Sequence, residues 1–194
     1  MADDLLSRLT RVGALKEGHF LLSSGRHSDR YVEKFDLLRQ PRETEAVCRG
    51  FSDRFADAGI DVVAGPTTGG IILAFEVARQ LGVASAYAER RSDDTTDREF
   101  RRGTTFTPGQ RVLVVDDILT TGGSVRETLA ALATQPVEVV AVAVLVDRSG
   151  GTVTFDNVPL FALSTLVVET WDATECPLCA KGLPLIKPGT TPTA

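Results

Sequence analysis

Two adjacent carboxylates are followed by a turn of hydroxyl residues and glycines in the middle of the chain. Asp116 and Asp117 come directly after the apolar run 112–115, and residues 120–124 read Thr-Thr-Gly-Gly-Ser. The backbone N–H groups of such a turn, with a helix N-terminus behind it, suit a phosphate. Carboxylates next to that turn can accept hydrogen bonds from ribose hydroxyls. We therefore predict a site for a ribose 5-phosphate. The alternative is an Asp-Asp pair that only ends a buried strand and caps a turn.

This turn differs from two common phosphate-binding loops. A P-loop needs a lysine just before the Ser or Thr, and Gly123 occupies that place. The G-x-G-x-x-G pattern of dinucleotide-binding turns is also absent. Ser124 and Glu127 have the spacing of a capping box, which predicts that a helix begins here.

A second turn of similar composition precedes another helical pattern. Residues 65–70 read Gly-Pro-Thr-Thr-Gly-Gly and lie between a short strand at 61–64 and a helix at 69–81. Paired glycines and hydroxyls let backbone amides approach a polyanion closely. If both strands belong to one parallel sheet, the two turns meet at its carboxyl edge, where the second turn would take a pyrophosphate.

Alternating strand and helix patterns predict an α/β fold with a parallel sheet and helices on its faces. Strands are expected at 61–64, 83–88, 112–115 and 137–146, with helices at 69–81 and from residue 124. The core is expected to span about 36–150 and to begin with a helix starting at Pro41. Before it we expect a helix over 5–12 and strands at 19–23 and 29–35. After it we expect short strands at 152–155 and 160–165. Residues 1–35 and 151–185 would form a smaller lid on a single domain, followed by a loose tail at 186–194.

Composition restricts the partners and the compartment. The 194 residues carry a net charge of −5, which argues against nucleic acids and anionic membranes as partners. The N-terminus lacks the basic and apolar regions of a signal peptide, and the apolar run 139–146 is too short to span a bilayer. Three cysteines do not make a disulfide framework. We expect a cytoplasmic protein.

Several motifs resemble one enzyme family. The stretch 112–124 resembles the phosphoribosyl pyrophosphate (PRPP) signature of the type I phosphoribosyltransferases. The segments 19–28, 62–66 and 146–148 are similar to those of the orotate phosphoribosyltransferase family and follow its order, and the Cys-Pro-Leu-Cys tail resembles a bacterial branch. The resemblance implies a type I phosphoribosyltransferase fold, with a mostly parallel sheet flanked by helices and a small hood. It also implies Mg²⁺-dependent transfer of the phosphoribosyl group from PRPP to orotate, giving orotidine 5′-phosphate and pyrophosphate.

The resemblance also assigns roles to individual residues. Asp116 and Asp117 would be catalytic, holding the ribose hydroxyls near a Mg²⁺ carried mainly by substrate oxygens. Orotate would contact Thr120, Arg148, Ser24 and Tyr31. PRPP would be bound by Asp116, Asp117, Ile118, Leu119, Thr120, Thr121, Gly122, Gly123, Ser124, Thr67, Thr68, Gly69, Arg90 and Arg91. A strained, potentially cis, non-proline peptide bond is also implied near the second turn.

The charged segment 89–102 contains almost no apolar residue. By composition it is a solvated β-hairpin. The resemblance implies a mobile loop that closes over pyrophosphate, usually from the neighbouring subunit of a homodimer, with Arg90 and Arg91 nearest the basic positions of the family. This loop lacks the usual lysines and histidine, and Ser23 and Gly69 stand where better-known members have lysine.

Two cysteines near the C-terminus have the spacing of half a zinc site. Cys176 and Cys179 would need two further ligands, and His19, His27 and Cys48 do not have matching spacing. Two such pairs could meet across a dimer. We expect a pair of small residues in a turn, with the histidines structural or peripheral ligands.

Two other functions remain open from the sequence. One is transfer of the phosphoribosyl group to a different nucleobase, because most of the lysines of the family are missing. The other is a PRPP-sensing regulator on the same fold. Such regulators normally add a DNA-binding domain or a basic face, and this acidic chain shows neither.

Overall fold

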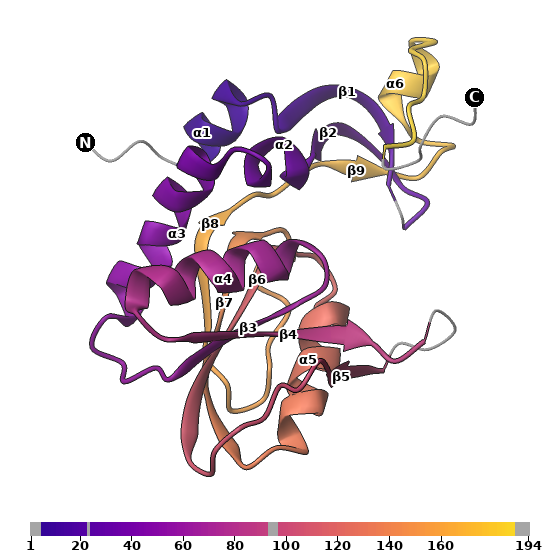
Figure 1. Cartoon of the computed structure of the whole chain (residues 1–194). Helices are drawn as coiled ribbons and strands as arrows, with labels where there is room; N and C mark the ends of the chain where they lie inside the picture. Colours follow the sequence, from indigo (N-terminus) through magenta and orange to yellow (C-terminus); the bar gives the residue numbers. More distant parts are fainter. Residues whose placement is uncertain (1–4, 23, 93–96, 189–194) are drawn as a thin grey trace. The chain divides into compact units, whose positions relative to one another are not determined.

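The computed structural model describes residues 5–22, 24–92 and 97–188, and the chain divides into two compact units (Figure 1). The larger unit is the continuous stretch Leu38–Leu166. The smaller unit combines the residues up to Leu37 with those from Val167 onward. No helix of the described part of the chain has the length and apolar character needed to cross a membrane.

A six-stranded sheet in the order β5-β4-β3-β6-β7-β8 forms the centre of the larger unit. All neighbouring strands are parallel except β4 and β5. The strands are β3 (Val62–Pro66), β4 (Ala84–Arg90), β5 (Arg98–Phe100), β6 (Gln110–Leu119), β7 (Val137–Asp147) and β8 (Leu160–Thr165). The valine-rich strands β6 and β7 are buried on both faces over most of their length, as expected for central parallel strands.

The helices of this unit are α3 (Pro41–Phe55), α4 (Gly69–Leu81) and α5 (Gly123–Ala133). The chain runs from β3 through α4 to β4, and from β6 through α5 to β7, in opposite directions along the sheet. Right-handed crossovers therefore place α4 and α5 on opposite faces, as Figure 1 shows. The reversal falls between β3 and β6, and ligands of open α/β sheets bind in the crevice at that point.

The smaller unit is built on an antiparallel sheet in the order β1-β2-β9. Its elements are α1 (Leu5–Arg11), β1 (Leu15–Leu21), β2 (His27–Val32), β9 (Thr170–Trp171) and α6 (Pro177–Ala180), while α2 (Lys34–Leu38) ends at the boundary. The C-terminal segment returns to this sheet. The Ile186 N–H donates to the His19 carbonyl, and the Leu21 N–H donates to the Ile186 carbonyl.

The structure confirms the α/β class and the mostly parallel sheet but moves several boundaries. The strand expected at 29–35 ends at Val32, and α2 follows it. Residues 152–155 form no strand, only an isolated bridge between Phe155 and Val158. The strand β8, expected in the lid, pairs with β7 in the larger unit because its register continues the parallel sheet. Ile186, expected in the loose tail, pairs with Phe20, and residues 189–194 lie outside the described part.

Candidate functional site

The two carboxylates lie at the end of β6 and face opposite sides of the sheet. The Asp116 carboxylate accepts a hydrogen bond from the Ser124 hydroxyl of α5 at 2.8 Å and another from the Asp117 N–H at 2.8 Å. Asp117 accepts one from the Ile118 N–H at 2.7 Å, and its other oxygen lies against Gly69 at the start of α4. Their exposed fractions are only 6% and 3%. Each carboxylate is thus fixed by local donors.

The predicted capping box is wrong. The cap of α5 is Gly122, in the left-handed conformation at φ 79°, and no side chain caps the helix. The Ser124 hydroxyl donates to Asp116 instead, and Glu127 forms an ion pair with Arg98. A carboxylate ending the preceding strand attracts the hydroxyl that would otherwise cap the helix.

The turn after β6 is exposed to solvent, and the Arg126 side chain of α5 supports its backbone. Thr120, Thr121 and Gly123 are exposed, as a phosphate cradle requires. Arg126 donates to the Thr121 carbonyl and to the Thr154 carbonyl, both at 3.1 Å, and its guanidinium stacks on Phe155 at 5.1 Å. A side chain at Gly122 would overlap Arg126. The turn is therefore held in shape before a ligand arrives, which lowers the entropy cost of binding.

The turn after β3 approaches the same switch point closely. It contains a cis peptide bond between Thr67 and Thr68, as the motif resemblance implies. A side chain on Gly65 would overlap the Gly70 carbonyl, and one on Gly69 would overlap the Asp117 carboxylate. Glycine at position 69 thus makes room for the Asp117 carboxylate.

Arg98 is a buried residue of this region that the sequence analysis did not single out. Its guanidinium donates to Glu127 of α5 at 2.9 Å, to the Thr67 hydroxyl at 2.9 Å and to the Ala88 carbonyl at 3.1 Å. It therefore ties the β4–β5 hairpin to the turn after β3 and to α5. An arginine in a charged segment is expected to be solvated, and only the burial of Arg98 and its hydrogen bonds to Thr67 and Ala88 show that it turns inward.

The remaining arginines of the charged segment mostly pair within it. Arg102 forms a two-pronged contact with Glu89, both hydrogen bonds at 3.0 Å, and this contact lowers the pKa of Glu89. Arg91 and Arg101 both pair with Glu99. Over residues 5–22, 24–92 and 97–188, the exposed Arg90 guanidinium has no ion-pair partner. The tip of the loop, 93–96, lies outside the described residues.

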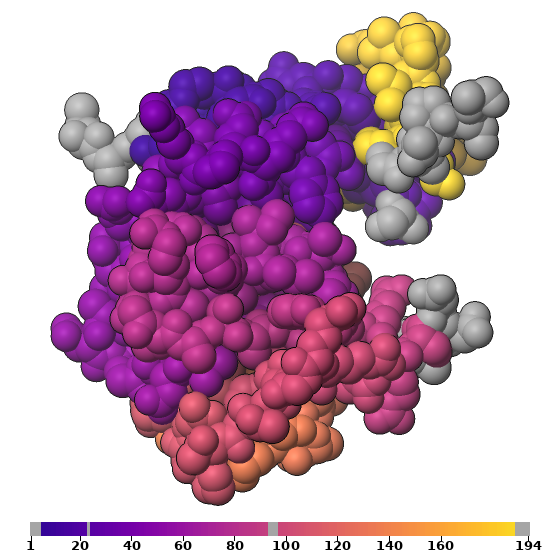
Figure 2. Space-filling model, viewed as in Figure 1, coloured from indigo at the N-terminus to yellow at the C-terminus, as the bar shows by residue number. Residues whose placement is uncertain are grey.

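The β4–β5 hairpin projects from the larger unit (Figures 1 and 2). It is a hairpin, as its composition predicts, and its two strands pair through Ala88–Phe100 and Arg90–Arg98. The segment therefore presents charged side chains beyond the body of the sheet.

Thr120 and Arg148 lie side by side. Their preceding residues, Leu119 and Asp147, are partners in the β6–β7 pairing, and the Arg148 N–H donates to the Leu119 carbonyl at 2.8 Å. Ser24 and Tyr31 belong to the smaller unit. Ser24 is exposed in the β1–β2 turn, and the Tyr31 ring lies 5.8 Å from that of Phe20. Ser23 lies outside the described residues.

The sequence spacing did not connect Cys176 and Cys179 with either histidine, but their side chains have histidine neighbours in the structure. The structure places both beside His19 and His27 within the smaller unit. Spacing along the chain could not reveal this group because hairpin pairing and the return of the C-terminal segment create it. The strands predicted at 19–23 and 29–35 placed His19 on a strand and left His27 in the turn, whereas in the structure β2 begins at His27 and pairs with β1.

Comparison with known proteins agrees with this geometry. A family model described as the phosphoribosyl transferase domain matches residues 36–175. An orotate phosphoribosyltransferase of Desulforamulus reducens is 43% identical over 96% of both chains, and one of Caldicellulosiruptor saccharolyticus is 47% identical over 91% of this chain and 90% of its own.

A solved structure supports the same assignment. The crystal structure of orotate phosphoribosyltransferase from Aeropyrum pernix superposes with a TM-score of 0.72 at 30% identity, covering 84% of this chain and 93% of that one. The α/β architecture described above is thus the type I phosphoribosyltransferase fold. The chain belongs to the phosphoribosyltransferase family, in its orotate phosphoribosyltransferase branch.

Proposed function

We propose that this chain transfers the phosphoribosyl group of PRPP to N1 of orotate, giving orotidine 5′-phosphate and pyrophosphate. The observation that carries the proposal is the meeting of two phosphate-suited turns and two buried carboxylates at the β3–β6 switch point. Relatives 43% and 47% identical over nearly the whole chain bear the name orotate phosphoribosyltransferase.

The 5-phosphate is assigned to the turn 120–124 and the ribose to the end of β6. Exposed Thr120, Thr121 and Gly123 offer hydroxyls and backbone N–H groups at the N-terminus of α5. Asp116 and Asp117 accept hydrogen bonds from the ribose hydroxyls. Ile118 and Leu119 form the backbone between these carboxylates and the phosphate turn. Their negative charge also favours the positive charge that develops at C1 as the leaving group departs.

Pyrophosphate is assigned to the turn 67–69 and to the charged hairpin. The C1–oxygen bond breaks with its electron pair going to pyrophosphate, while orotate N1 loses its proton to solvent and forms the new bond to C1. Because the reaction needs no protein nucleophile, the enzyme acts by holding both reactants in line. Arg90 and Arg91 are placed to compensate the charge of the leaving group, and the described residues offer the Arg90 guanidinium no ion-pair partner.

The donor set at the end of β6 fits a hard cation. Carboxylate and hydroxyl oxygens are the ligands that Mg²⁺ prefers. Since the oxygens of Asp116 and Asp117 already accept protein hydrogen bonds, we infer that Mg²⁺ is carried mainly by substrate oxygens near these two residues. Bound there, it neutralises phosphate charge. Turnover should therefore require added Mg²⁺.

The carboxylate of orotate is assigned to Arg148. A guanidinium binds a planar carboxylate through two parallel hydrogen bonds, and Thr120 lies beside it to contact the ring. The roles of Ser24 and Tyr31 toward orotate stay predictions.

We also propose a cytoplasmic homodimer in which the segment 89–102 serves the neighbouring subunit. The projection of the β4–β5 hairpin beyond the body of the larger unit supports this. Mixing Arg91→Ala subunits with Asp117→Asn subunits should restore activity, since one hybrid site contains neither lesion. A monomer in sedimentation, or subunits that exchange without recovering activity, would count against a shared site.

The activity is tested by following the absorbance of orotate with PRPP and Mg²⁺, beside matched reactions with uracil, hypoxanthine and adenine. We expect turnover of orotate alone. Faster turnover of another base would assign a different substrate. Tight PRPP binding without turnover of any base would favour a regulator.

A further inference from the structure

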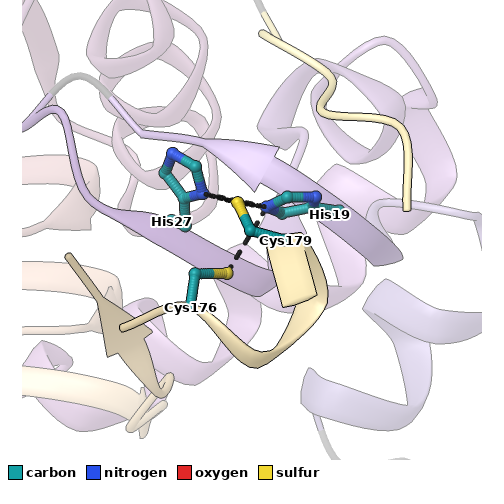
Figure 3. A group of neighbouring side chains, drawn as sticks. All are labelled: His19, His27, Cys176 and Cys179. Carbon is teal, nitrogen blue, oxygen red and sulfur yellow. Dashed lines mark hydrogen bonds between the residues drawn. The ribbon is translucent and has the colours of Figure 1, made fainter. Parts of the chain in front are cut away.

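Two histidines and two cysteines converge within the smaller unit (Figure 3). His19 lies on β1 and His27 on β2, while Cys176 precedes α6 and Cys179 lies within it. One nitrogen or sulfur atom from each residue lies within 4.8 Å of all the others. Both histidines and Cys176 are buried and Cys179 is exposed. Residues 157 positions apart in the chain thus direct soft or borderline donor atoms toward one point.

The distances match a tetrahedral metal site. Around a zinc ion with ordinary bond lengths, ligand atoms are about 3.3 Å apart for two nitrogens and about 3.5 Å for nitrogen and sulfur. Here His19 Nε2 lies 2.9 Å from His27 Nδ1 and 3.5 Å and 3.7 Å from the sulfurs of Cys176 and Cys179. The Cys179 sulfur lies 3.3 Å from His27 Nδ1. A small expansion between the two imidazoles would admit the ion.

The surroundings orient one imidazole as a ligand. The Leu183 carbonyl lies 2.9 Å from His19 Nδ1, on the side of the ring away from the cluster. A carbonyl can only accept, so Nδ1 carries the proton and Nε2 presents its lone pair to the cluster. Metal-binding histidines usually have such a partner on the second nitrogen. In contrast, hydrogen bonding alone would satisfy this group poorly, because thiols are weak donors.

We propose that His19 Nε2, His27 Nδ1 and the sulfurs of Cys176 and Cys179 bind one Zn²⁺. Two sulfurs and two nitrogens in a tetrahedral arrangement favour zinc over the harder divalent cations. The site is structural rather than catalytic, since four protein ligands leave no open position for water or substrate.

The ion links the β1–β2 hairpin to the C-terminal segment. The helix α6 has only four residues, all of them exposed or half-buried. Zinc ties it to the β1–β2 hairpin, next to the segment in which Ile186 pairs with β1. Because the ligands come from both ends of the chain, they meet only when the smaller unit folds. Metal binding and folding of this unit are therefore coupled.

The first test is the metal content of the full-length protein purified under reducing conditions without a histidine tag. We expect about one zinc per chain in the parent and a large loss in Cys176→Ser and Cys179→Ser. The matched control is Cys48→Ala. Cys48 lies in α3 of the larger unit, fully buried, and burial raises its pKa to about 12. This variant should keep its zinc.

A second measurement does not depend on the variants folding. Zinc is removed from the parent and Co²⁺ is added. Tetrahedral sulfur and nitrogen ligation should give intense visible absorption and a thiolate charge-transfer band, and added Zn²⁺ should abolish both. The melting temperature of the metal-free protein should also rise with Zn²⁺. Purified protein with negligible zinc and no cobalt bands would overturn the proposal. So would a Cys176–Cys179 disulfide that persists under reduction.

Discussion

Replacing Arg98 by alanine should cost far more stability than replacing Arg102, although both arginines belong to the same hairpin. The Arg98 side chain is 5% exposed and its partner Glu127 20%, whereas the Arg102 side chain is 68% exposed. Arg98→Ala removes one hydrogen bond to a charged group, at about 1.5–3 kcal/mol, and two to neutral acceptors, at about 1 kcal/mol each. Because water reaches Glu127 in part, we expect a net loss of about 3 kcal/mol in the free energy of unfolding.

Denaturant titration measures this loss, and the melting temperature should fall by about 6–12 °C in a chain of this size. Arg102→Ala should leave the free energy of unfolding close to the parent value, because its ion pair is exposed. Arg98 acts on the site through Thr67 and through Glu127 of α5, so kcat/KM for PRPP should fall about tenfold or more where the protein remains folded. Equal effects of the two substitutions on stability would refute the reasoning. So would an additive double-mutant cycle between Arg98→Ala and Glu127→Gln.

Three further predictions concern the larger unit. Gly123→Ala should keep the melting temperature, because no atom lies closer than 3.9 Å to the added methyl group, yet raise the KM for PRPP at the exposed phosphate turn; an unchanged KM would move the 5-phosphate elsewhere. Arg148→Ala should raise the KM for orotate far more than that for PRPP in steady-state kinetics, and equal effects would remove Arg148 from the base side. The hydrogen bond from Arg79 holds the pKa of Glu76 in the folded protein below its ordinary value of 4.5. The ionised carboxylate therefore stabilises the fold above about pH 4.5, and this stability is lost as the pH falls through the pKa of the folded state. Glu76→Gln should flatten the acid side of the stability profile in urea titrations from pH 3 to 7, and an unaltered profile would contradict this.

The sheet and its central helices were predictable because their sequence patterns are local. The run 112–115 is apolar throughout, the stretch 137–146 is apolar except for Glu138, and valine is the most frequent residue in both, which is typical of strands buried on both faces. The helix α4 covers the predicted range 69–81. It ends at Gly82, which adopts the left-handed conformation at φ 72° that is typical of helix C-termini.

Features that depend on contacts distant in sequence were not predictable. Ser124 has the sequence of a helix cap, but its hydroxyl donates to Asp116, eight residues earlier. Arg98 is one of several arginines in a polar run, and its partners Thr67 and Glu127 lie about 30 residues away on either side in the sequence. The cysteine pair has no zinc spacing with His19 because the chain folds back over more than 150 residues before they meet.

The most direct test of the ribose 5-phosphate site is calorimetric titration of ribose 5-phosphate into the parent protein, Asp116→Asn and Asp117→Asn. Binding needs no turnover, so the measurement is independent of the acceptor base. We expect the parent to bind and both variants, with circular dichroism and melting behaviour near those of the parent, to bind at least about tenfold more weakly. Parent-like affinity in both variants would contradict the assignment of the ribose to the end of β6.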